Sequence, residues 1–73
     1  EGNAFAFTGN VEEDLLSITS VHPMRQDAVN EFLMRAGADW AVVDRLLERN
    51  ELTRTQFGNR QFYLRRLHAD SRR

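Results

Sequence analysis

The sequence predicts a small α+β domain of winged-helix-like type, with three helices followed by a β-hairpin. Three observations support this. Apolar residues recur at helical spacing in three stretches before Asn50. The second and third stretches are joined by a very short segment containing Gly37, which is typical of a helix-turn-helix. From Leu52 the pattern alternates around Gly58-Asn59, a pair that favours a two-residue hairpin turn.

Composition limits the chain to one domain. Its 73 residues are 41% hydrophobic, enough for one compact core. There is no cysteine, which excludes disulfides, thiolate zinc sites and cysteine-bound iron–sulfur clusters within this segment. No apolar run approaches the roughly 20 residues of a membrane span, and no signal-peptide pattern is present. We therefore expect a cytoplasmic domain with no membrane contact.

The ends of the chain differ in character from its middle. Residues 1–9 combine alanine and phenylalanine with two glycines, and we expect an extended arm or linker from an upstream domain. The winged-helix-like domain itself is expected over residues 10–67. Residues 68–73 are polar and are expected to fray. The start at Glu1 without methionine suggests a segment of a longer polypeptide.

The first helix is expected over about residues 11–20. Asn10 is a good N-cap, and Glu13 stands three residues further on, where its carboxylate would reach back to the cap. Pro23 ends this helix and suits the first turn of the next one, expected over about 24–36. The small first strand of a winged helix would lie around residues 21–24 or, if the arm folds back, around residues 4–7.

Gly37 is placed where a left-handed C-cap glycine belongs, and Asp39 is a good N-cap for a third helix over about 40–49. The hairpin strands are expected at about 52–57 and 60–66. With Gly58-Asn59 as the turn, Phe57 pairs with Arg60. The pattern favours a core-facing side containing Thr53, Thr55, Phe62 and Leu64, and an outer side containing Arg54, Gln56, Gln61, Tyr63 and Arg65.

Charge is unevenly distributed along the chain. Residues 1–51 hold ten acids and four arginines, whereas residues 52–73 hold six arginines and one acid. The third helix would be the recognition helix of a DNA-binding winged helix, but its outward residues are mostly acidic. Because DNA binding depends on neutralising phosphates, we expect no sequence-specific DNA recognition.

The basic hairpin provides the candidate contact residues for RNA or a protein partner. An outward tyrosine among arginines is suited to stacking on an unpaired base, although the same strip could complement the acidic helices. These candidates are Arg54, Arg60, Tyr63, Arg65 and Arg66.

No residue pattern supports a catalytic, cofactor or metal site. His22 and His68 lack partners at metal-ligand spacing, and His22 before Pro23 is better explained as a turn or cap residue. The acids show no pairing that indicates general acid–base chemistry. We therefore expect no catalytic residue, no metal and no cofactor in this segment.

Several runs resemble the C-terminal region of radical S-adenosylmethionine Fe–S oxidoreductases, a group related to the wyosine-forming tRNA-modifying enzymes. They are Phe7-Thr8-Gly9-Asn10-Val11-Glu12-Glu13-Asp14-Leu15-Leu16, Val21-His22-Pro23-Met24-Arg25, Asp27-Ala28-Val29, Gly37-Ala38-Asp39-Trp40 and Phe62-Tyr63-Leu64-Arg65. The resemblance implies a parent enzyme with a 4Fe–4S cluster and S-adenosylmethionine. The three-cysteine cluster motif of that group lies in an N-terminal barrel, so no catalytic residue carries over to this chain.

We therefore expect a non-catalytic accessory domain that positions substrate or docks against the upstream catalytic domain. Two alternatives remain open. One is a winged-helix nucleic-acid-binding module of a regulator, and the other is a protein–protein interaction or dimerisation domain.

Overall fold

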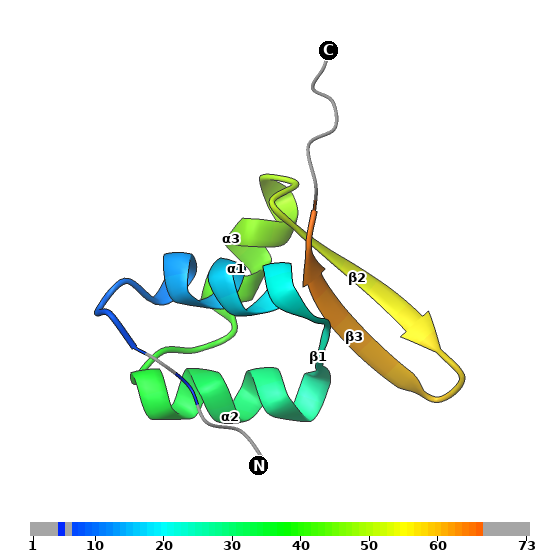
Figure 1. The fold of residues 1–73 in the computed structure, drawn as a ribbon, viewed down its shortest axis with the longest axis horizontal. Helices are drawn as coiled ribbons and strands as arrows, with labels where there is room; N and C mark the ends of the chain where they lie inside the picture. The colour runs from blue at the N-terminus through cyan, green and yellow to red at the C-terminus, as the bar shows by residue number, and fades with distance from the viewer. Residues whose placement is uncertain (1–4, 6, 67–73) are drawn as a thin grey trace.

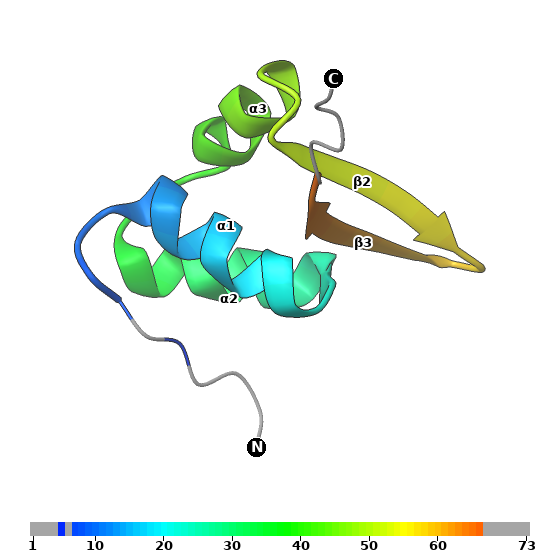
Figure 2. The same ribbon diagram turned by 45° about the horizontal axis from the view of Figure 1, so that its top comes forward.

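The computed structural model describes residue 5 and residues 7–66, which form three helices and a three-stranded antiparallel sheet. The helices gather on one side, and the hairpin formed by the last two strands extends away from them (Figures 1 and 2). The α+β class, with its three helices and C-terminal hairpin, is confirmed. The expected frayed tail, residues 68–73, lies outside the described residues, as does most of the expected arm.

Helix α1 (Val11–Val21) begins where the capping pattern predicts. The Asn10 side chain accepts the backbone N–H of Glu13 at 3.1 Å. Three acids in the first turn are stabilised by the positive end of the helix dipole. The helix ends at His22, whose extended backbone precedes Pro23 and whose N–H still donates to the Ile18 carbonyl. His22 is therefore a cap residue, as the sequence predicts.

The second expected helix starts two residues too early. Met24 and Arg25 form a short strand, β1 (Met24–Arg25), and helix α2 (Gln26–Ala36) follows directly. Met24 pairs with Tyr63 in the sheet and its side chain is buried, so packing and pairing override the preference of Pro23 for a first helical turn. Of the two predicted locations for the small first strand, the one ending at Met24 is close to correct.

The connection between α2 and α3 (Ala41–Glu48) contains the predicted left-handed glycine. Gly37 has φ 72°, and the N–H of Ala38 donates back to the Leu33 carbonyl at 2.9 Å. The carboxylate of Asp39 accepts the N–H of Ala41 at 3.0 Å. The third helix is thus one residue shorter at each end than expected, although Asp39 still satisfies a backbone donor at its start.

Strands β2 (Leu52–Phe57) and β3 (Arg60–Arg65) have the predicted register, with Phe57 opposite Arg60. Gly58 has φ 56°, so glycine supplies the turn geometry. The prediction of which face lies inward is wrong. Leu52 and Tyr63 are buried, whereas Thr55 is exposed and Phe57 is 71% exposed.

Tyr63 is buried in the core instead of lying in an outer basic strip. Because β3 is the central strand in the order β1-β3-β2, Tyr63 lies between Met24 and Arg54. Met24 and Leu52 join it from the other two strands, and the remaining core residues come from one face of each helix, with Leu15, Phe32 and Leu46 fully buried. Across the described residues, none of the helices is long and apolar enough to cross a membrane.

Candidate functional site: a polar pocket at the hairpin tip and an apolar hairpin face

The five candidate contact residues do not form one surface strip. Tyr63 is 3% exposed, and its ring lies 5.7 Å from that of Trp40. It is therefore not available for stacking on a base, which corrects the sequence-based prediction. The four arginines are exposed but lie in three different places.

Each of these arginines has different neighbours. Arg60 borders a pocket near the hairpin tip, and Arg54 borders a shallow hollow with the acidic residues Asp44 and Glu48 of α3. Arg65 and Arg66 lie at the opposite end of β3, beside the loop that leaves α1. The positive charge of the hairpin is thus spread along its length.

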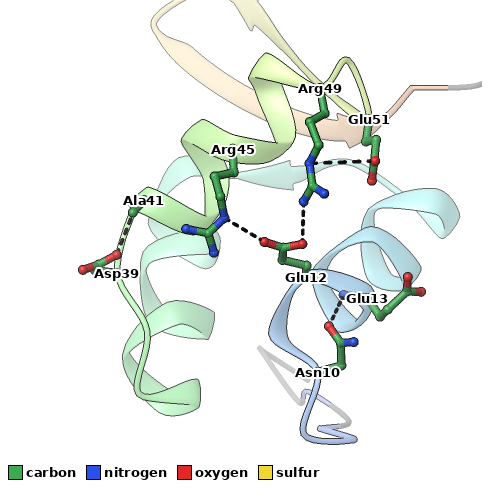
Figure 3. Close-up of polar contacts among 8 residues, drawn as sticks. All are labelled: Asn10, Glu12, Glu13, Asp39, Ala41, Arg45, Arg49 and Glu51. Atoms are coloured by element: carbon green, nitrogen blue, oxygen red, sulfur yellow. Dashed lines mark hydrogen bonds and ion pairs between the residues drawn. The ribbon is translucent and has the colours of Figure 1, made fainter.

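A carboxylate of α1 holds the two arginines of the α3 segment, Arg45 and Arg49. Glu12, in the first turn of α1, accepts the Nε–H of Arg45 at 2.9 Å and an Nη2–H of Arg49 at 2.6 Å (Figure 3). Hydrogen bonds from Arg45, followed by those from Arg49, hold the pKa of the Glu12 carboxyl below its ordinary value. No sequence pattern predicts this contact, because it joins residues more than 30 positions apart.

A second carboxylate ties the segment before α1 to the helix. Asp14 is 5% exposed and accepts the hydroxyl of Thr8 at 2.7 Å and the backbone N–H of Thr8 at 2.8 Å. These two hydrogen bonds, the hydroxyl first, lower the pKa of the Asp14 carboxyl. Asp14 is therefore a structural carboxylate, with both oxygens already engaged.

The arginines that precede the hairpin differ from those on it in their ion pairing. Arg25, Arg35, Arg45 and Arg49 each form an ion pair with a carboxylate. Within the part of the chain that the structure describes, Arg54, Arg60, Arg65 and Arg66 form none. Among the described arginines, those on the hairpin and Arg66 directly after it therefore lack a carboxylate partner.

One pocket brings residues from four separate segments together at the hairpin tip. We call it the tip pocket; its volume is about 540 Å³ and its lining is mainly polar, with one indole ring. The residues that line it are Arg25, Gln26, Asp27, Asn30, Trp40, Asn59, Arg60 and Gln61. Sequence reasoning named only Arg60 from this group, because no local motif signals a site assembled by the fold.

A second candidate surface is apolar and lies on one face of the hairpin. The hairpin side that faces away from the buried residues carries Phe57 and Phe62, whose rings meet edge to face at 6.1 Å. Phe57 is 71% exposed, and Val21 at the end of α1 is 75% exposed. We call the side formed by Thr53, Thr55, Phe57, Phe62 and Leu64 the outer hairpin face.

The residues present do not fit the cluster that the family resemblance implies for a parent enzyme. A 4Fe–4S cluster is bound chiefly by cysteine thiolates, and the chain contains none. Among the described residues, no group of three or more histidines or acids is placed to hold a metal ion.

Comparison with known proteins gives one curated relative. The chain is 36% identical over 67 residues to the UPF0026 protein MJ1312 of Methanocaldococcus jannaschii. The match covers 92% of this chain and 21% of that protein, so the chain spans about one fifth of the length of its relative. No family model and no solved structure matches the chain. The chain thus has a UPF0026 homologue, whose name states no activity, substrate or partner.

Proposed function

We propose that this chain is a winged-helix-like accessory domain, without catalytic residues of its own, that docks against the rest of a larger enzyme. The outer hairpin face is the observation that carries the proposal. Phe57 and Phe62 form an aromatic pair on a strand face whose other side is already packed on the core. Phe57 is 71% exposed and Phe62 is partly buried beside it. An exposed aromatic ring in an apolar patch is typical of a protein-interaction surface.

The proposed occupant of this face is the remaining part of the parent polypeptide. The curated relative contains roughly four fifths of its length outside the matched region. The resemblance to radical S-adenosylmethionine Fe–S oxidoreductases suggests that this part is a catalytic barrel with a 4Fe–4S cluster. In this arrangement the domain positions substrate or closes against the barrel.

The charge of α3 favours this role over sequence-specific DNA binding. Arg45 and Arg49 are both engaged by Glu12, which leaves Asp44 and Glu48 exposed on the same helix. A recognition helix with this surface would repel phosphates instead of neutralising them. A regulator that reads duplex DNA through α3 is therefore the weaker alternative.

Hydrogen exchange tests the docking proposal. The 73-residue chain is compared with the same residues inside the full-length product of its gene. We expect amides of residues 53–57 and 60–64 to exchange more slowly in the full-length protein, with little change over residues 41–48. Equal exchange in both proteins, or a gene that encodes no further domain, would contradict the proposal.

A matched pair of variants sharpens this test. Phe57→Asp should remove the added protection, whereas Met34→Asp on α2 should not, although both side chains are 71% exposed. If the isolated chain instead dimerises through Phe57 and the full-length protein shows no added protection, the face is a dimer interface and the docking proposal is wrong. Light scattering on the wild type and Phe57→Asp distinguishes these outcomes.

A further inference from the structure

We propose that the tip pocket binds a nucleotide, with the base against Trp40 and the phosphate near Arg60. The pocket adjoins the outer hairpin face, because Arg60 lies directly opposite Phe57, but its lining includes none of the five residues that define that face. The inference does not depend on the docking proposal, because it is tested on the 73-residue chain alone. It rests on three properties of the pocket: a fixed aromatic ring, a set of side-chain amides and an unpaired arginine.

The aromatic ring is held in place by two contacts. The Trp40 Nε1–H donates to Oδ1 of Asn30 at 3.1 Å, and the indole lies 5.7 Å from the ring of buried Tyr63. Trp40 is only partly buried and lines the pocket. A ring fixed in this way is prepared for stacking on a base without a large loss of side-chain entropy.

The amides supply the polar groups that a base edge requires. Four of the eight lining residues are asparagine or glutamine. Asn30 is engaged by Trp40 through its Oδ1, so the amides offered to a ligand are those of Gln26, Asn59 and Gln61. Each side-chain amide has two N–H donors and one carbonyl acceptor, which match the mixed donor and acceptor pattern of base edges. A simple anion or an aliphatic ligand would make no use of this set.

The charged residues that line the tip pocket favour binding of a phosphate next to Arg60. Arg25 is engaged by Asp27 at 3.5 Å, whereas Arg60 forms no ion pair with the described residues. The lining therefore carries two arginines against one acid, an excess of one positive charge. An arginine that has no carboxylate partner is well suited to a bidentate contact with phosphate oxygens.

A free nucleotide and a nucleotide within a single strand both carry the base and the phosphate that this pocket would bind. The test uses the 15N-labelled 73-residue chain, because Trp40 is its only tryptophan and gives one indole N–H resonance. The four ribonucleoside monophosphates and inorganic phosphate are titrated separately at low salt. We expect a saturable shift of the indole resonance with at least one nucleotide and a smaller, non-saturating response to phosphate alone.

Two arginine variants of equal charge change provide the control. Arg60→Gln should weaken nucleotide binding on the order of tenfold, the loss expected for one charge-assisted hydrogen bond. Arg54→Gln, on the same hairpin but outside the pocket, should leave binding within about twofold of the wild type, as expected for a charge that makes no direct contact. The absence of a saturable shift, an equal response to phosphate alone, or equal weakening by both variants would overturn the proposal.

Short oligoribonucleotides identify the source of the ligand. If an oligonucleotide shifts the Trp40 resonance at lower concentration than its mononucleotide, and Arg60→Gln weakens both, the ligand is a nucleotide within a single strand. If the mononucleotide binds as well or better, the ligand is a free nucleotide. Oligonucleotide binding that leaves the Trp40 resonance unchanged would contradict the assigned pocket.

Discussion

Glu12 and Arg49 are 37 positions apart in the sequence, and their side chains meet at 2.6 Å. The contact joins the first turn of α1 to the end of α3, and Arg45 adds a second hydrogen bond to the same carboxylate. Because both arginine side chains are about half exposed, the contribution to stability is modest. Its main effect is to fix the relative position of two helices.

Glu12→Gln should lower the free energy of unfolding near neutral pH by about 1 kcal/mol or less, the range for exposed ion pairs. The pKa of Glu12 is lowered in the folded state from 4.5, so its carboxylate stabilises the fold above that pH. The stabilisation is lost as the pH falls below 4.5 and the carboxylate is protonated. Urea denaturation of both proteins at several pH values should show the difference shrinking toward acid pH.

The neighbouring residue provides the control for this prediction. Glu13→Gln removes the same charge from the same helical turn without removing a contact to Arg45 or Arg49. Its effect should be smaller at neutral pH. A Glu12→Gln effect that is no larger than that of Glu13→Gln would show that the arginine contacts add nothing to stability.

Thr8→Val should raise the pKa of the Asp14 carboxyl toward its ordinary value. The substitution removes the hydroxyl that donates at 2.7 Å, the largest cause of the lowered pKa, and keeps the backbone N–H donor. An NMR titration of the Asp14 carboxyl carbon measures the change. Thr55→Val, at an exposed position on the hairpin, should leave that midpoint unchanged.

Tyr63→Ala should lower the free energy of unfolding by about 3–5 kcal/mol, the range for loss of a large buried aromatic side chain. Tyr63 is 3% exposed and packs against Trp40, so the substitution leaves a cavity between the sheet and the helices. Phe62→Ala removes a ring from the next residue, which is less buried, and should cost less. Equal losses in urea denaturation would argue against the inward orientation of Tyr63.

Gly37→Ala should cost about 1–2 kcal/mol, the strain of a left-handed residue with a Cβ. No atom lies within 4 Å of the position that the Cβ would occupy, so the cost arises from the backbone and not from a clash. Gly37→Asn should cost less, because asparagine tolerates this conformation. If asparagine and alanine destabilise equally in thermal denaturation, backbone strain is not the cause.

Features determined by neighbouring residues could be predicted from the sequence. The Asn10 cap, the Gly37 turn and the hairpin register each depend on residues within a few positions of one another. The inward face of the hairpin could not be predicted in the same way. Its more apolar face, which carries Phe57 and Phe62, is the one that points away from the core. Burial of Tyr63 is decided by Met24 and Trp40, which lie far away in the sequence.

In the candidate sites too, features set by composition could be predicted, whereas contacts between residues distant in the sequence could not. The basic character of the hairpin follows from composition, but the pairing of Arg45 and Arg49 with Glu12 requires the helices to be placed in space. The tip pocket joins β1, the start of α2, the residue before α3 and the hairpin turn. No sequence spacing indicates that Asn30, Trp40 and Arg60 lie around one pocket.

The central position of β3 has a consequence for synthesis of the chain. Strand β1 has its sheet partner in residues 62 and 63, near the end of the described chain. While the ribosome adds residues at roughly 5–20 per second, the first three helices emerge before that partner exists. The nascent domain therefore keeps Met24 without its strand neighbour until the hairpin leaves the exit tunnel, and the core is completed only after the hairpin has emerged.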